Sequence, residues 1–252
     1  MNATFHDLKG VSVFITGGGS GIGAALTDGF LAQGAKVAFV DIVDASDFAA
    51  EMAQKHGHKP LFIPCDITDT GALTAAMDKA AEDHGGLQIL VNNAANDMRY
   101  DAMQVTPADW DASHDVNLKA YFFACQKAAA LMDKGGSIIN YSSITYMMGA
   151  AGMAPYMSAN AGIMGLTRGL AREWGPQGIR VNAIAPGWVF TEKQETQWAT
   201  PAAKAAFLDK QCLKTFMQPQ DMVGGTLFLA SNASAMMTGQ VMVIDAGVAH
   251  AG

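Results

Sequence analysis

The amino-acid sequence predicts an α/β fold, in which a doubly wound parallel sheet of about seven strands carries helices on both faces. Short apolar runs alternate with longer amphipathic segments along most of the chain, and a glycine-rich turn joins the first of each at residues 17–23. No internal repeat, low-complexity tract or sign of a second domain interrupts this alternation. We therefore expect residues 1–252 to form a single domain.

The composition is that of a globular protein, since 50% of the 252 residues are hydrophobic and 15% are charged. The net charge of -7 argues against binding to nucleic acid or to an anionic membrane. No segment predicts a membrane span, and the N-terminal segment lacks the pattern of a signal peptide, so we expect a cytoplasmic protein. The three cysteines and scattered histidines have no metal-ligand spacing, and no metal site is expected.

The strands are expected where apolar residues run together without a helical period. Each run ends at a polar residue, glycine or proline, and ligands bind at the carboxyl ends of such strands. The expected strands cover residues 11–15, 35–40, 61–64, 89–91, 137–141, 180–184 and 240–244.

The helix boundaries follow from glycine, proline and capping residues. Gly57 and Gly85 are expected to end two helices, while Thr106-Pro107, Pro155 and Pro201 are expected to begin others. The expected helices include residues 24–33, 44–56, 70–84, 114–132, 155–174 and 219–231. Residues 188–200 have little periodic pattern, and we expect a substrate lid around residues 188–215.

The glycine-rich turn reads Thr16-Gly17-Gly18-Gly19-Ser20-Gly21-Ile22-Gly23. Glycines there would let the backbone approach a pyrophosphate, whose negative charge suits a helix N-terminus. A purely structural turn could use the same residues. The carboxylate of Asp41, at the end of the next strand, favours dinucleotide binding over a purely structural turn, because it can bind an adenosine ribose. It would repel a 2'-phosphate, and no Arg or Lys directly follows it, so we predict NAD as the cofactor.

Two further polar residues leave alternatives open. Asp66 either accepts a hydrogen bond from the adenine amino group or begins a turn before a helix capped by Thr68. Asn117 lies among apolar neighbours and must be hydrogen-bonded, so it either braces a backbone or holds a water in the site.

Together the motifs resemble the short-chain dehydrogenase/reductase family over essentially the whole chain. The matching pieces are residues 16–23, Asp66, Asn92-Asn93-Ala94-Ala95, Asn117, Ser143, Tyr156 and Pro186-Gly187. The resemblance implies that Ser143 holds the substrate oxygen, Tyr156 transfers the proton and Asn117 anchors a water relay. It also implies a homotetramer, which fits the high apolar content of the helices that carry Asn117 and Tyr156.

The site residues expected from motif and resemblance fall into three groups. The catalytic residues are Ser143, Tyr156, Asn117 and Asn160. The cofactor-binding residues are Gly17, Ser20, Gly21, Ile22, Gly23, Asp41, Ile42, Asp66, Ile67, Asn93, Tyr156, Asn160, Pro186, Gly187, Val189 and Thr191. The substrate-binding residues are Asn96, Arg99, Ser143, Tyr146, Tyr156, Trp188 and Gln194, and Asn140 is also expected to face the pocket.

The sequence departs from the family at Asn160, where the family has a lysine four residues after the tyrosine. Asn160 shares a helix face with Tyr156 and could still hydrogen-bond the cofactor ribose. It supplies no positive charge to lower the pKa of Tyr156. Three explanations stay open: an engineered Lys-to-Asn variant, a natural enzyme in which the oxidised nicotinamide's charge and a water relay suffice, or an NAD-binding protein without catalysis.

A softer resemblance connects residues 93–99, 186–189, 211–214 and 244–247 with bacterial sugar dehydrogenases, particularly those that oxidise free aldopentoses (D-xylose-type) and related aldoses at C1. We therefore predict NAD-dependent oxidation of a sugar hydroxyl, foremost that of an aldose at C1 to its lactone. Arg99 keeps open a dehydrogenase of a sugar acid, such as a 2-keto-3-deoxy acid, because a guanidinium binds carboxylates. A catalytically weak or inactive NAD-binding scaffold is the alternative from another class.

Overall fold

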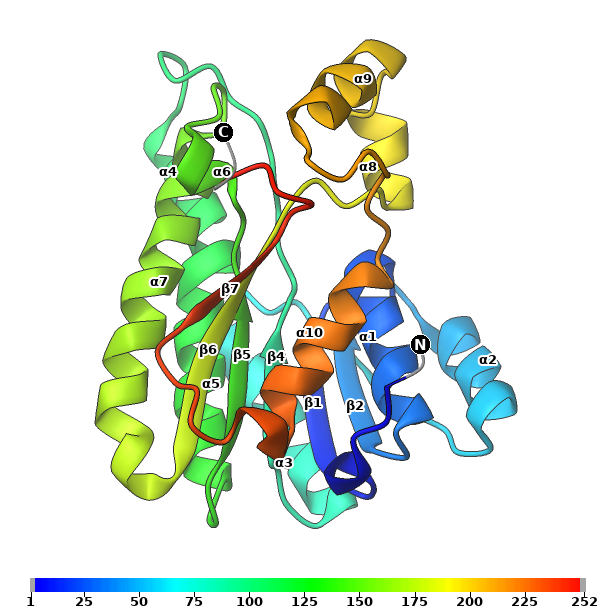
Figure 1. Cartoon of the computed structure of the whole chain (residues 1–252). Coiled ribbons are helices and arrows are strands. Elements are labelled where there is room, and N and C mark those ends of the chain that lie inside the picture. Colours follow the sequence, from blue (N-terminus) through cyan, green and yellow to red (C-terminus); the bar gives the residue numbers. More distant parts are fainter. Residues whose placement is uncertain (1–2, 250–252) are drawn as a thin grey trace.

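A computed structural model describes residues 3–249 and has the predicted α/β architecture (Figure 1). One sheet of seven parallel strands has the order β3-β2-β1-β4-β5-β6-β7. The strands are β1 (Ser12–Thr16), β2 (Lys36–Asp41), β3 (Leu61–Pro64), β4 (Ile89–Asn92), β5 (Gly136–Tyr141), β6 (Ile179–Pro186) and β7 (Val241–Ile244). All seven lie where the sequence predicts them.

The helices are α1 (Gly21–Ala32), α2 (Ser46–His56), α3 (Thr70–His84), α4 (Pro107–His114), α5 (Ala120–Leu131), α6 (Thr145–Met148), α7 (Ala154–Trp174), α8 (Glu192–Gln197), α9 (Pro201–Lys210) and α10 (Asp221–Ala230). A π-helical turn, Asp115–Lys119, lies between α4 and α5, so the long helix predicted from residue 114 is interrupted at its start. Two short helices, α6 and α8, are additional to those predicted.

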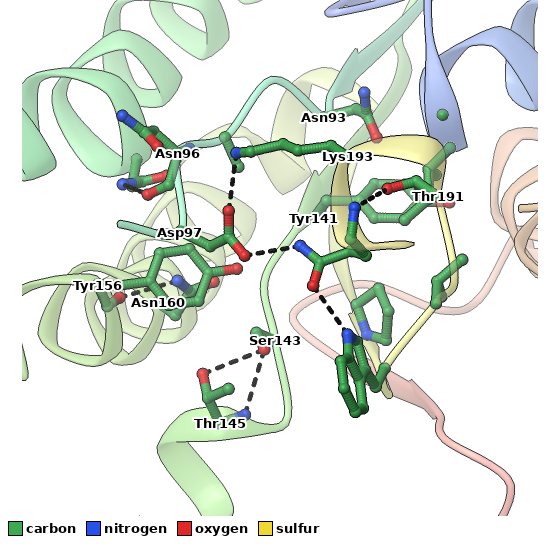
Figure 2. A pocket seen from close by; sticks show the side chains of 18 of the residues that line it. Asn93, Asn96, Asp97, Tyr141, Ser143, Thr145, Tyr156, Asn160, Thr191 and Lys193 are labelled. Carbon is green, nitrogen blue, oxygen red and sulfur yellow. Dashed lines mark hydrogen bonds and ion pairs between the residues drawn. The ribbon is translucent and has the colours of Figure 1, made fainter. Parts of the chain in front are cut away.

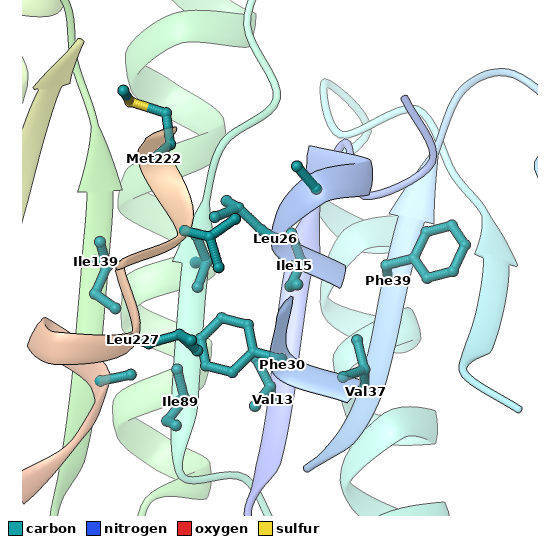
Figure 3. Close-up of a cluster of buried hydrophobic side chains, with 14 of the residues drawn as sticks. Val13, Ile15, Leu26, Phe30, Val37, Phe39, Ile89, Ile139, Met222 and Leu227 are labelled. Carbon is teal, nitrogen blue, oxygen red and sulfur yellow. The ribbon is translucent and has the colours of Figure 1, made fainter. Parts of the chain in front are cut away.

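Both faces of the sheet are covered, which explains why the strands read as unbroken apolar runs. Val13 and Ile15 of β1 point to the face packed by α1, α2 and α10, where Leu26, Phe30 and Leu227 complete a core cluster (Figure 3). Alternate strand residues, such as Phe14, point to the opposite face. There they pack with α3, α5 and α7.

Capping residues fix several helix ends as expected. Thr106 begins α4 with a reciprocal capping box to Asp109, and Gly57 ends α2 at a φ of 76°. The N-cap of α3 is Asp69, which accepts a hydrogen bond from the Ala72 amide. The expected cap at Thr68 is therefore wrong by one residue, because Thr68 instead donates to Asp66.

The strand order reverses between β1 and β4, and the carboxyl ends of the strands form a crevice at such a switch point. Helices α6, α8 and α9 lie at this edge of the sheet (Figure 1). Within residues 3–249, no helix combines the length and apolarity that crossing a membrane would require.

Candidate active site

A cavity of about 1180 Å³ lies at the carboxyl edge of the sheet. Its walls come from the glycine-rich turn, the ends of β2, β4, β5 and β6, the start of α7, and helices α8 and α9. This volume accommodates a dinucleotide together with a small substrate.

The glycine-rich turn has the backbone conformation that requires glycine. Gly17 and Gly21 have φ of 66° and 51°. A Cβ on Gly23 would lie 1.8 Å from the carbonyl oxygen of Gly17, so this glycine permits close packing of the turn against α1. Asn93 supports the turn from β4, since its Nδ2 donates to the carbonyl oxygens of Thr16 and Gly17 at 3.1 and 3.0 Å.

The first turn of α1 is suited to an anionic group. Its N-cap, Ser20, makes no side-chain capping hydrogen bond, and no acidic residue lies in the turn. Ser20, Gly21 and Ile22 line the cavity. The free N–H groups and the positive end of the helix dipole therefore fit a pyrophosphate, and the residues present fit a dinucleotide.

Asp41 and Asp66 lie in the same cavity wall. The Asp41 carboxylate accepts hydrogen bonds from the amides of Gly19 (3.0 Å) and Val43 (3.2 Å), which hold it beside the glycine-rich turn. The Oδ1 atom of Asp66 accepts from the amide and hydroxyl of Thr68 at 2.9 and 2.7 Å. Asp66 thus begins a turn and also faces the cavity, so its two predicted roles are compatible.

Tyr156 enters the cavity from the first turn of α7, opposite Ser143, which follows β5 by two residues (Figure 2). Burial raises the pKa of Tyr156 to about 12, the negative charge of Asp97 adds to this increase, and hydrogen bonding to Ser143 and Asn160 opposes it. The Ser143 hydroxyl oxygen accepts from the amide and hydroxyl of Thr145, at 3.2 and 3.1 Å. Those bonds leave the Ser143 proton available for donation.

Asn160 is buried and lies one helical turn beyond Tyr156. Its Nδ2 donates to the backbone carbonyl oxygen of Tyr156 at 2.8 Å, so one amide proton is used within α7. The Ser142 hydroxyl donates to the Asn160 carbonyl at 3.0 Å. This position carries no charge to favour the tyrosinate.

Asn117 lies in the π-helical turn and braces a backbone segment. Its Oδ1 accepts from the Asn96 amide, and its Nδ2 donates to the Asn96 carbonyl, both at 2.9 Å. The same Nδ2 donates to the Ser113 carbonyl. The side chain therefore fixes the segment after β4 at the edge of the cavity, which supports the first of its two predicted roles.

Asp97 and Lys193 also line the cavity, and the sequence reasoning missed both as site residues. Lys193 Nζ lies 2.8 Å from Asp97 Oδ1, and Gln194 Nε2 donates to Asp97 Oδ2 at 2.7 Å. The Trp188 indole donates to Gln194 Oε1 at 2.8 Å. The position of Asp97, an acidic residue in the segment after a central strand, could have indicated that it faces the site. The segment around Lys193 has no periodic pattern, so the sequence gave no such indication for Lys193.

Most predicted site residues meet in this cavity, with three exceptions. Gly23 contributes through packing rather than by lining the cavity. Tyr146 lies outside the lining, on the short helix α6. Asn140 is fully buried beneath the site, where it accepts from Asn92 and donates to Thr167. The expectation that Asn140 faces the pocket is therefore wrong, because a buried amide is held by these neighbours.

Arg99 lines the cavity, but its guanidinium is stacked on Trp198, with Cζ 4.2 Å from the ring centroid. One face of the cation is thus covered by the aromatic ring, as in a cation–π contact.

Residues 17–249 match the family described as enoyl-(acyl carrier protein) reductase. The chain belongs to the short-chain dehydrogenase/reductase family. It is 47% identical over 251 residues to a probable galactose dehydrogenase of Rhizobium meliloti, covering 98% of each chain. It is 43% identical over 250 residues to a D-xylose 1-dehydrogenase of Caulobacter vibrioides, again covering 98% of each.

Solved structures agree with this family assignment. A putative short-chain alcohol dehydrogenase from Sinorhizobium meliloti superimposes with a TM-score of 0.92 at 33% identity, covering 97% of this chain and 98% of the other. A blue fluorescent protein from a metagenomic library, in complex with NADPH, has a TM-score of 0.89 at 32% identity and covers 96% and 99%. This short-chain dehydrogenase/reductase is thus an oxidoreductase of a fold that binds a nicotinamide cofactor.

Proposed function

We propose that this short-chain dehydrogenase/reductase oxidises an aldose at C1 to its lactone, with NAD as the hydride acceptor. The observation that carries the proposal is the likeness, over nearly the whole chain, to relatives named for galactose and D-xylose oxidation, one of them at C1. The cavity fits this chemistry, because it combines a phenol and a serine with polar and aromatic walls.

In the proposed reaction, Ser143 donates a hydrogen bond to the oxygen on C1 of the sugar, and Tyr156 accepts the hydroxyl proton as the general base. A bound nicotinamide supplies the hydride acceptor. Asn117 contributes indirectly, since it fixes the backbone at Asn96 beside the substrate. Asn160 orients the first turn of α7 through its bond to the Tyr156 carbonyl and can offer its second amide proton to the ribose.

The preference for NAD rests on Asp41. Its carboxylate lies at the end of β2, where it can accept from a free ribose hydroxyl and would repel a 2'-phosphate. The cations that line the cavity, Arg99, Lys193 and Lys210, come from other segments. Titration with NADH and NADPH tests this, and we expect the substitution Asp41→Ala to reduce the preference for NADH. Equal affinity of the unaltered protein for both would contradict it.

The sugar-acid alternative has weaker support. It requires Arg99 to bind a carboxylate, and this guanidinium stacks on Trp198 within the cavity wall. A panel of aldoses and sugar acids with NAD, followed by the absorbance of NADH, separates the two. Turnover of aldoses supports our proposal, whereas turnover confined to sugar acids would replace it with the alternative.

The non-catalytic scaffold is supported only by Asn160. Whether this asparagine is natural or engineered, the protein could still be an enzyme that turns over slowly. Tight NAD binding without turnover of any substrate, even in the Asn160→Lys variant, would favour the scaffold.

The remaining expectations are also part of this proposal. We infer that residues 188–215 act as a substrate lid, since α8 and α9 line the cavity. The proposed homotetramer is consistent with the exposed aromatic side chains of Trp110 and Phe122. Light scattering during size-exclusion chromatography tests the assembly, and a monomer would exclude it. The cytoplasmic location stays a prediction.

A further inference from the structure

We propose that Asp97 and Lys193 form a subsite for sugar hydroxyl groups beyond the reacting carbon. This inference rests on the proposed oxidation of an aldose and deepens it, since it assigns recognition of the substrate to an ion pair between the segment after β4 and helix α8.

The carboxylate of Asp97 faces the cavity and is held in a fixed orientation. Its side chain is 18% exposed, Lys193 binds one oxygen and Gln194 binds the other (Figure 2). A carboxylate has about four acceptor positions, so each oxygen can still accept a further hydrogen bond. The protein thus fixes the orientation of the Asp97 carboxylate, and its oxygens can still accept hydrogen bonds from a ligand.

Lys193 supplies the complementary donors. Its ammonium group has three N–H bonds, of which the ion pair with Asp97 occupies one. The Lys193 side chain is 45% exposed, so a substrate can reach the remaining two. Since a hydroxyl group both donates and accepts, two neighbouring hydroxyls of a sugar match an adjacent carboxylate and ammonium.

The pair lies close to the proposed reaction centre. Asp97 is near enough to Tyr156 for its charge to raise the pKa of the phenol, in addition to the effect of burial. Figure 2 shows Asp97 between Tyr156 and the amine of Lys193. A sugar whose C1 hydroxyl meets Tyr156 and Ser143 can therefore present its other hydroxyls to the pair.

Nearby aromatic side chains give the subsite a wall. Trp188 is oriented by its bond to Gln194, which Asp97 orients in turn, and Trp188 packs edge-on against Phe207 of α9. The ring, the carboxylate and the ammonium are thus parts of one connected arrangement. Such a combination of flat apolar surface with a few fixed polar groups is typical of small-molecule sites.

Calorimetric titration of the NADH-loaded protein with an aldose and its monodeoxy analogues tests the subsite, because NADH prevents turnover. In the unaltered protein, we expect omission of at least one hydroxyl to weaken binding by about tenfold or more. In Asp97→Leu and Lys193→Met, omission of the hydroxyl that the lost group bound should have little effect, because neither new side chain forms strong hydrogen bonds. The ion pair of Asp78 with Lys127 lies outside the cavity, so Asp78→Leu and Lys127→Met are matched controls.

The outcomes distinguish a sugar-binding subsite from an ion pair that only holds helix α8 in place. If the two cavity variants weaken every aldose and every deoxy analogue by one common factor, the pair only holds α8, and the subsite proposal is wrong. If no aldose binds, the subsite and the proposed function both fail. If aldoses bind but are not oxidised, the proposed function fails, and the deoxy comparison still decides the subsite.

Discussion

At the scale of single residues, Tyr156, the proposed general base, has Asn160 where the family resemblance implies a lysine. The phenol has a pKa raised to about 12 by burial and by Asp97, and Asn160 contributes a hydrogen bond but no charge. Near neutral pH only a very small fraction of the phenol is ionised. The unaltered enzyme should therefore oxidise its substrate slowly, with kcat/KM rising about tenfold per pH unit across the neutral range.

A lysine at position 160 should reverse part of this effect. The ammonium favours the ionised phenol, so the pKa of Tyr156 decreases, and in Asn160→Lys we expect a higher rate and a pH profile shifted downward. Steady-state kcat and kcat/KM across pH measure both. The neutral replacement Asn160→Gln serves as the control, and an identical profile in the lysine variant would show that position 160 does not tune Tyr156.

Asn117 should matter for stability as well as for the site. In Asn117→Ala, the amide and carbonyl of Asn96 lose their partners, and we expect the free energy of unfolding to fall by about 1 to 3 kcal/mol. Urea denaturation measures this. Exposed Asn232 provides the control, since Asn232→Ala should change stability by less than about 0.5 kcal/mol. Equal effects of the two substitutions would refute the bracing role.

The residues that could be predicted from sequence are those that stand in local motifs. Ser143 and Tyr156 follow from their spacing in the family pattern, and Asp41 follows from its place after a strand. Asp97 and Lys193 are separated by 96 residues, so no local pattern signals their ion pair. The burial of Asn140 was missed for the same reason, because its partner Thr167 lies on another element.

At the scale of elements, glycine and proline made most boundaries predictable. The seven strands and the capped helices were predicted because their signals are local, as with Thr106 before α4 and Gly57 after α2. Short helices such as α6 and α8 have little intrinsic stability and depend on tertiary contacts. Their sequences therefore gave no adequate signal.

The glycine-rich turn makes the clearest prediction at this scale. In Gly23→Ala, the new methyl group would overlap the Gly17 carbonyl oxygen, which lies 1.8 Å from its position, so the turn must shift. We expect a large loss of NADH affinity, measured by fluorescence titration. In α7, a Cβ on Gly169 has no atom within 4 Å, so Gly169→Ala should retain affinity and stabilise the helix by up to about 1 kcal/mol. Unchanged affinity in Gly23→Ala would argue against this phosphate-binding turn.

At the scale of the whole molecule, a buried thiol and buried phenols should make the free energy of unfolding decrease at alkaline pH. Burial raises the pKa of Cys125 to about 12, and it also raises the pKa values of Tyr121 and Tyr141. These groups are neutral in the folded protein, whereas in the unfolded chain they ionise at their ordinary pKa values of 9.0 for Cys and 10.0 for Tyr. The stability that they contribute is complete below those values and is lost as pH rises through the folded pKa values.

Urea denaturation as a function of pH tests this expectation. The free energy of unfolding should decrease steadily between about pH 9 and pH 12, and Cys125→Ala should reduce the slope at the start of this range. A free energy that stays constant across the range would contradict the assigned burial of these groups.

The proposed function requires a hydride to pass from C1 of an aldose to a nicotinamide. Incubation with NAD and a C1-deuterated aldose, followed by mass spectrometry of both products, measures that transfer directly. We expect deuterium in the reduced nicotinamide and none in the lactone. Deuterium retained in an oxidised sugar, with unlabelled NADH, would place the reaction at another carbon and contradict it.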